Sequence, residues 1–205
     1  MNKKKRIPAI TTIIAILALL LSVYNTCVTH YKPAAMTIKV LGFTGPLPDV
    51  VGTPVTANLV FSNLGKRNIV IAGVLLKIND PTSPSKYSLN KWINPYKGEK
   101  TIPTLIPSQQ TILKTIEFDC PQAFELEKMI GKTDKNEIRS EVIVTYVNSN
   151  GKLCDIYFDY VRFNFNARKE YFGYSVNLNN NTATLDDYKK GESILEGIYG
   201  SKMTY

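Results

Sequence analysis

The chain has 205 residues, of which 44% are hydrophobic and 20% charged, and its formal net charge is +8. This length provides one ordinary domain with appendages, and this balance of apolar and charged residues excludes a globally disordered chain. Four of the 25 basic residues stand at positions 3–6, which leaves 21 basic against 17 acidic residues elsewhere. Because this surplus is mild and is not gathered in one motif, nucleic acid is not expected as a partner.

The first 30 residues, MNKKKRIPAITTIIAILALLLSVYNTCVTH, combine a basic start with a long apolar stretch. A run of about 20 such residues is long enough to cross a bilayer as a helix. We expect residues 1–30 to form a cytoplasmic basic tail and a single transmembrane anchor in the cell membrane. A linker follows over 31–36, and the positive-inside rule places the rest of the chain outside the cytoplasm. Secretion after cleavage of a signal peptide is the alternative, although the small residues that cleavage needs are poorly placed.

From Thr37 onward, short apolar runs are separated by turn residues, which is typical of an all-β domain. The pattern predicts strands over 37–43, 55–62, 69–79, 110–118, 138–147 and 153–165. In the run 55–62, alternate residues are apolar, as in a strand with one buried face. In the run 69–79, both sets of alternate residues are apolar, so we expect this strand to be covered on both faces. Asn150-Gly151 predicts a hairpin with a type I′ turn, which pairs the last two strands antiparallel.

Three further segments complete the chain. Residues 122–132 carry Phe124, Met129 and Ile130 near helical spacing, which predicts one short covering helix. The segment 79–109 is long, rich in Pro and Lys, and contains the only Trp. After residue 165 the sequence becomes polar, so residues 166–205 are expected to form a loosely ordered C-terminal tail.

The order of these features is similar to that of the immunoglobulin-like modules of bacterial envelope proteins. The resemblance lies in the Asn63-Leu64-Gly65 corner after the second strand, the Pro-led segment LIPSQQTILKTIEF and the Tyr-bearing hairpin. It implies an antiparallel β-sandwich over residues 37–165 that follows a single N-terminal transmembrane helix. It also implies that the turn from Asn63 to Asn68 is a corner of the scaffold rather than a binding site.

No catalytic or metal-binding motif has the required spacing, so no cofactor is expected. The single histidine, His30, precedes the folded domain, which excludes a Ser-His-Asp or Cys-His arrangement inside it. Asp155 and Asp159 share one strand face about 13 Å apart, which is too wide for the two carboxylates of a glycosidase. Cys120 and Cys154 are predicted not to bond, because the intervening strand separates them by about 30 Å.

The sequence therefore favours a membrane-anchored, extracytoplasmic binding module without catalysis, whose partner is an envelope protein or polymer. The candidate partner-binding residues are the aromatic and basic residues of the 79–109 segment: Tyr87, Lys91, Trp92, Tyr96 and Lys97. Trp92 covering the edge of the core is the structural alternative for this segment. Two other functions stay open, a carbohydrate-active envelope hydrolase and a self-associating structural subunit.

Overall fold

The structure is a computed structural model, and it describes residues 6–30, 35–48, 50, 52–79, 103–118, 122–188 and 193–194. The chain divides into two compact units, Met1–Pro33 and Ala34–Tyr205. The first unit contains helix α1 (Arg6–His30), and its side chains are described from Thr12 to Cys27. Within the described residues, no helix has both the length and the hydropathy of a membrane span. The transmembrane anchor therefore stays a prediction.

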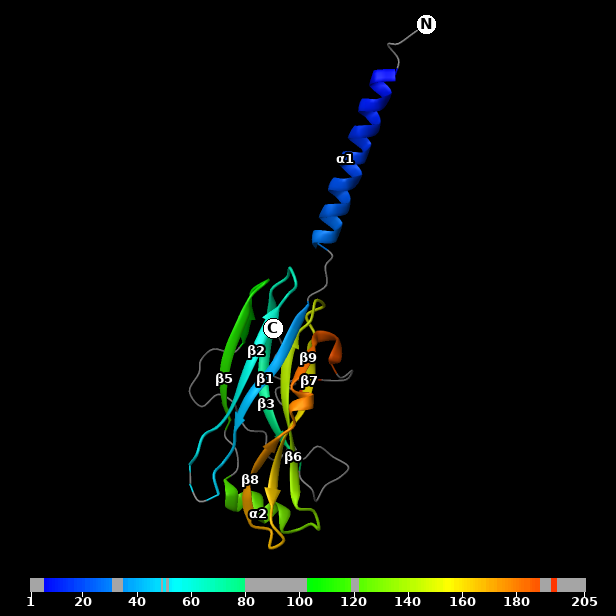
Figure 1. The fold of residues 1–205 in the computed structure, drawn as a ribbon. Helices are drawn as coiled ribbons and strands as arrows, with labels where there is room; N and C mark the ends of the chain where they lie inside the picture. The colour runs from blue at the N-terminus through cyan, green and yellow to red at the C-terminus, as the bar shows by residue number, and fades with distance from the viewer. Residues whose placement is uncertain are drawn as a thin grey trace. The chain divides into compact units, whose positions relative to one another are not determined.

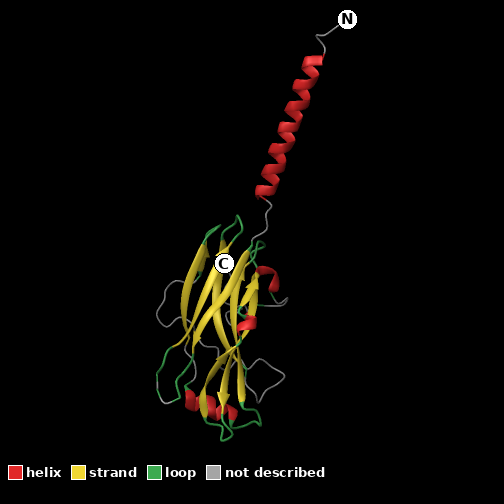
Figure 2. Cartoon of the chain, in the orientation of Figure 1, coloured by secondary structure: helices red, strands yellow, loops and turns green. Residues whose placement is uncertain are grey.

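The second unit consists mainly of two antiparallel sheets (Figures 1 and 2). The four-stranded sheet has the order β5-β2-β1-β9, and the five-stranded sheet has the order β4-β3-β6-β7-β8. The strands are β1 (Met36–Thr44), β2 (Val55–Asn63), β3 (Ile69–Ile78), β4 (Thr104–Ile106), β5 (Thr111–Phe118), β6 (Glu137–Val147), β7 (Leu153–Phe165), β8 (Tyr171–Val176) and β9 (Thr182–Thr184). Two 3-10 turns, Leu178–Asn180 and Leu185–Asp187, flank β9.

The main core lies between the two sheets and draws on both. In strand β2, every second side chain is buried and those between are half-buried, so one face of the strand points into this core. The fully buried side chains of greatest volume come from the facing β7, namely Tyr160, Phe158 and Phe163. At about 1.5–3 kcal/mol for each large apolar side chain, burial of this kind supplies the main driving force for folding. The predicted β-sandwich architecture is supported at this level.

All six predicted strands are present, with ends that differ by one residue at most from the prediction. Three short strands, β4, β8 and β9, escaped prediction. Strands β8 and β9 correct the domain boundary, because they pair with β7 and β1 beyond residue 165. Residues 171–176 and 182–184 are thus part of the sheets rather than of a loosely ordered tail. These two strands have too few alternating apolar and polar residues, in too polar a part of the sequence, to be predicted as strands.

Asn63 fixes the corner between β2 and β3. It is fully buried, and its Nδ2 donates to the main-chain oxygens of Arg67, Ile106 and Pro107 at 2.8, 3.2 and 3.0 Å. Its Oδ1 accepts from the Gly65 N–H at 3.0 Å. One amide therefore satisfies main-chain groups from its own turn, from the last residue of β4 and from the residue after it. This agrees with the prediction that the corner is scaffold.

The antiparallel pairing of β6 with β7 confirms the predicted hairpin, but the turn type was wrong. Gly151 has φ +75°, whereas Asn150 does not have a positive φ. The Gly151 N–H donates to the Asn148 oxygen at 3.0 Å, and the Asn148 N–H donates to the Lys152 oxygen at 2.9 Å. This is a three-residue loop in which only the last residue adopts the left-handed region. The side chain of Asn148 stabilises it by accepting from two later N–H groups.

Helix α2 (Ala123–Ile130) confirms the predicted covering helix, and it lies beside β8 in Figure 1. Leu126 and Ile130 are its fully buried residues, and Met129 packs against the core in part. Phe124, expected on the buried face, is 51% exposed, with the Lys128 Nζ 5.1 Å from its ring centroid. Gln122 is the N-cap of the helix, and its N–H donates to the Glu125 carboxylate at 3.2 Å.

Candidate binding face

The five candidate residues of the sequence prediction lie outside the described residues: Tyr87, Lys91, Trp92, Tyr96 and Lys97. The point at which their segment leaves the sheet is described. Asn79 follows directly on β3, and its N–H donates to the main-chain oxygen of Arg139 at 3.0 Å. The segment carrying the candidate residues therefore starts beside Arg139 on β6.

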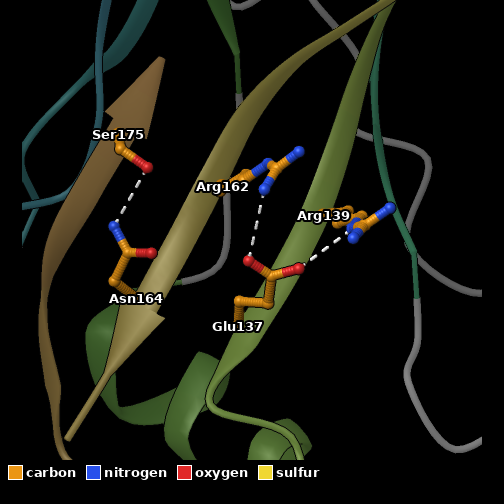
Figure 3. A network of polar contacts seen from close by, with 5 residues as sticks. All are labelled: Glu137, Arg139, Arg162, Asn164 and Ser175. Carbon is orange, nitrogen blue, oxygen red and sulfur yellow. Dashed lines mark hydrogen bonds and ion pairs between the residues drawn. The ribbon is translucent and has the colours of Figure 1, made fainter. Parts of the chain in front are cut away.

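Arg139 belongs to a polar cluster on the outer face of the five-stranded sheet (Figure 3). Strand pairing positions its members: Arg139 stands opposite Arg162, and Arg162 stands opposite Ser175. The neighbouring row is Glu137, Asn164 and Gly173, in the same strand order. We call Glu137, Arg139, Arg162, Asn164 and Ser175 the polar row cluster.

Two arginines directly opposite one another on adjacent strands repel, and Glu137 offsets this repulsion. Its carboxylate accepts from Arg139 Nε at 2.9 Å and lies 3.6 Å from Arg162 Nη1. The hydrogen bond from Arg139 to Glu137, together with the charge of Glu137, raises the pKa of Arg139, and the charge of Asp159 adds to this. Asn164 Nδ2 extends the cluster to β8 by donating to Ser175 Oγ at 3.2 Å.

The guanidinium groups remain open to solvent. The Arg139 side chain is 56% exposed and the Arg162 side chain 35% exposed. Exposed ion pairs contribute about 0–1 kcal/mol to stability at most. The arrangement thus does little for folding, but it holds two planar donor groups in a defined position on the outer face.

The next row along the same face is buried. Lys77 stands opposite Glu141, and their side chains form an ion pair of 2.9 Å with exposed fractions of 6% and 16%. Removing one partner of such a pair leaves a buried charge, which costs about 3–5 kcal/mol. Along the strands, the solvent-exposed row of Arg139 and Arg162 is therefore followed directly by the buried row of Lys77 and Glu141.

Further along this face, Asp155 anchors the covering segment near the C-terminus. It is 3% exposed, and its carboxylate accepts from Thr145 Oγ1 at 2.6 Å, Ser193 Oγ at 2.8 Å and the Ile194 N–H at 2.8 Å. Ile194 packs on a second apolar cluster formed by residues of β3, β6 and β7, namely Ala72, Leu75, Ile143, Leu153 and Tyr157. This confirms that β3 is covered on both faces.

Titratable side chains around this face make specific polar contacts. Among the described residues, no group of three or more His, Cys, Asp or Glu residues could hold a metal ion. Glu137, Glu141 and Asp155 accept from arginine, lysine, hydroxyl or main-chain donors. Cys154 is a buried free thiol, and its Sγ accepts from Asn148 Nδ2 at 3.4 Å.

The polar row cluster was missed in the sequence, although part of its signal is present. Charged residues recur at every second position in EIRSE, Arg162 and Asn164 stand two residues apart in DYVRFN, and the Asn150-Gly151 turn suggests which strands pair. A bulge at Ser140/Glu141 shifts the register by one residue, so counting back from the turn does not bring Arg139 opposite Arg162.

Comparison with known proteins finds no family model that matches this chain and no curated protein that matches it. Function is therefore inferred from the residues of this chain alone.

Proposed function

We propose that the protein is a membrane-anchored, extracytoplasmic, immunoglobulin-like module that binds an envelope protein or polymer without catalysis. The observation that carries the proposal is the in-register pair Arg139–Arg162 on the open part of the outer face. Arginine is enriched at protein interfaces and recognises carboxylates and phosphates in bidentate geometry. Glu137 orders both side chains beforehand, which reduces the entropy that binding costs.

The strand order supports the immunoglobulin-like assignment. Strand β2 lies between β1 and β5, and β3 lies between β4 and β6, with β7 next to β6. This is the order of strands A, B and E in one sheet, and of C′, C, F and G in the other, in immunoglobulin-like domains. Strands β8 and β9 extend this plan by one strand on each sheet. In such modules the sheet that contains C, F and G offers a broad outer face.

The sequence and exposure of α1 support the membrane anchor. The helix runs for 25 residues, and no Asp, Glu, Lys or Arg occurs between Arg6 and Lys32. Its described aliphatic side chains are more than half exposed, including Ile13, Leu17 and Leu20 at 57%, 55% and 58%. Exposed apolar side chains gathered on one helix favour a nonaqueous environment. Resistance of the full chain to alkaline extraction from membranes tests this part, and release into the soluble fraction would contradict it.

The binding face is tested by partner capture from native membranes after mild crosslinking. Replacing Arg139 and Arg162 together with Ala should reduce capture at least tenfold, because two guanidinium contacts are lost. Arg168→Ala is the matched control, since Arg168 is exposed but lies on the hairpin outside this face. The Trp92→Ala/Tyr96→Ala variant tests the predicted loop residues in the same assay. Full capture by both double variants would refute the proposal.

A further inference from the structure

The free edges of the two sheets differ in how well they are protected. Natural sheets blunt their edges with short strands or bulges, because an open edge is a template for another strand. Strands β4 and β9 have three residues each, and β8 is interrupted by a bulge at Phe172, next to Gly173, where φ is +147°. Strand β5 has eight residues and pairs with β2 at every position without a register shift. Strand β3 also has no described partner beyond Ile71 on the side of β4, but its pairing with β6 is interrupted by a register shift at that point. Among the described strands, β5 is therefore the longest regular edge.

The main-chain groups of β5 that face outward follow from its pairing with β2. The Asn63 N–H donates to the Gln110 oxygen at 2.8 Å, so residues 63 and 110 form a hydrogen-bonded pair. Hydrogen-bonded pairs recur at every second residue of an antiparallel ladder. Ile112, Lys114, Ile116 and Phe118 therefore bond to β2. The N–H and C=O groups of Thr111, Leu113, Thr115 and Glu117 point away from it.

These outward groups have no partner among the described residues. The side chains of Thr111, Leu113, Thr115 and Glu117 are all exposed, Leu113 by 61%. In the part of the chain that the structure describes, no main-chain hydrogen bond joins these four residues to anything beyond β5. Within the described chain, the edge therefore offers four donors and four acceptors in an ordered, extended row.

We propose that a second copy of this chain pairs with this edge, β5 antiparallel to β5, so that two four-stranded sheets become one sheet of eight strands. A two-fold axis normal to the sheet keeps the buried faces on the same side, and it passes midway between the two copies of one β5 residue. An axis at Lys114 would set the two lysines opposite one another, which is unfavourable. An axis at Thr115 avoids this. It pairs Thr115 with Thr115 of the second copy, and Leu113 with Glu117 of the second copy.

A second copy fits this edge better than a flexible peptide does. Its β5 is already extended and ordered by β2, so pairing requires no folding, whereas a disordered segment would lose conformational entropy. Edge pairing buries a small area, which corresponds to a weak interaction between free molecules. The membrane anchor of the proposed function raises the effective concentration of the copies and so favours the dimer. The dimer does not use the polar row cluster. A test that refutes the dimer therefore leaves partner binding by the cluster standing, and the reverse also holds.

Disulfide crosslinking tests the register in membranes that contain the full chain. The native cysteines Cys27 and Cys120 are changed to Ser and Cys154 to Ala, and Thr115→Cys is introduced alone. In the proposed dimer the two residues at 115 have Cα atoms about 5.5 Å apart, which a disulfide can bridge. Glu117→Cys alone is the matched control, because its two copies stand about 13 Å apart along the strands. We expect rapid oxidation to a dimer for Thr115→Cys and at least a tenfold lower rate for Glu117→Cys.

A proline variant separates strand pairing from chance collision. Leu113→Pro in the Thr115→Cys background removes an outward N–H but none of the hydrogen bonds to β2, so the domain should fold. Crosslinking should fall at least tenfold, whereas Leu113→Ala should keep it, and thermal unfolding verifies that both variants are folded. Equal crosslinking at positions 115 and 117, insensitivity to Leu113→Pro, or a Thr115→Cys disulfide to another protein would overturn the proposal.

Discussion

Two buried hydroxyl groups stand out at the level of single residues. Among the described residues, Tyr160 is the largest fully buried side chain of the core, and its hydroxyl has no hydrogen-bond partner among them. Ser140 Oγ, equally buried, has no partner in the described chain either. Burying a hydroxyl without a partner costs about 1–3 kcal/mol. Both residues adjoin the bulge of the β6–β7 pair, where the register is interrupted.

Replacing Tyr160 with Phe should therefore raise the free energy of unfolding by about 1 kcal/mol, because it removes the unsatisfied group and keeps the ring. Tyr146→Phe is the matched control. Its hydroxyl donates to the Leu185 oxygen at 2.9 Å, so this change should lower the free energy of unfolding by about 1 kcal/mol. Urea unfolding of the three proteins measures both values. An equal loss in the two variants would contradict the assignment of Tyr160 as unsatisfied.

At the level of elements, the hairpins on either side of β7 are built alike. Asn166 repeats the role of Asn148: its N–H donates to the Glu170 oxygen at 3.0 Å, and its own oxygen accepts from the Lys169 N–H at 2.9 Å. Lys169 occupies the position of Gly151 and has φ +65°. A non-glycine residue in this region costs about 1–2 kcal/mol. Two hydrogen bonds of the exposed Lys169 Nζ, to Lys135 O and Asn136 Oδ1, offset part of that cost.

Exchanging the residue types at these two positions should have opposite effects. Gly151→Lys should lower the free energy of unfolding by about 1 kcal/mol, because it forces a side chain into the left-handed region. Lys169→Gly should leave it unchanged or raise it by up to about 1 kcal/mol. Thermal or urea unfolding decides between them. If Lys169→Gly costs as much as Gly151→Lys, the hydrogen bonds of Lys169 outweigh the backbone strain, and this account of the hairpin is wrong.

For the whole domain, two buried tyrosines predict sensitivity to alkaline pH. Burial raises the pKa of Tyr146, with the neighbouring Cys154 adding to the effect, and burial also raises the pKa of Tyr160. The ordinary pKa of tyrosine is about 10. Above that pH an unfolded chain releases these protons while the folded one retains them. Their contribution to stability is therefore complete below about pH 10 and is lost as the pH rises further.

Each of these tyrosines should remove up to about 1.4 kcal/mol of stability per pH unit above pH 10. The Tyr146→Phe/Tyr160→Phe double variant lacks both groups, so its stability should fall less steeply than that of the natural chain between about pH 9.5 and pH 11. Urea unfolding at a series of pH values provides the two slopes. Parallel slopes would show that neither tyrosine retains its proton in the folded state.

The sequence by itself determined the long strands, the helix α2 and the double covering of β3. Each depends on the local spacing of apolar and polar residues, and this spacing can be read from consecutive positions of the sequence. Strand β7 does not follow a single alternation along its whole length. The even-numbered residues Ile156, Phe158 and Tyr160 and the odd-numbered Val161, Phe163 and Phe165 all face the same core. Simple alternation cannot place both sets there.

Only the tertiary structure decided which side chains meet. The bulge at Tyr160 reverses the alternation of β7, and the same shift brings Arg139 opposite Arg162. Pairing with β7 and β1 decided that β8 and β9 are strands, and the absence of a neighbour in the described chain made β5 an edge. The physical reason is that register and edge status depend on hydrogen bonds between segments far apart in sequence, where one inserted residue turns every later side chain to the other face.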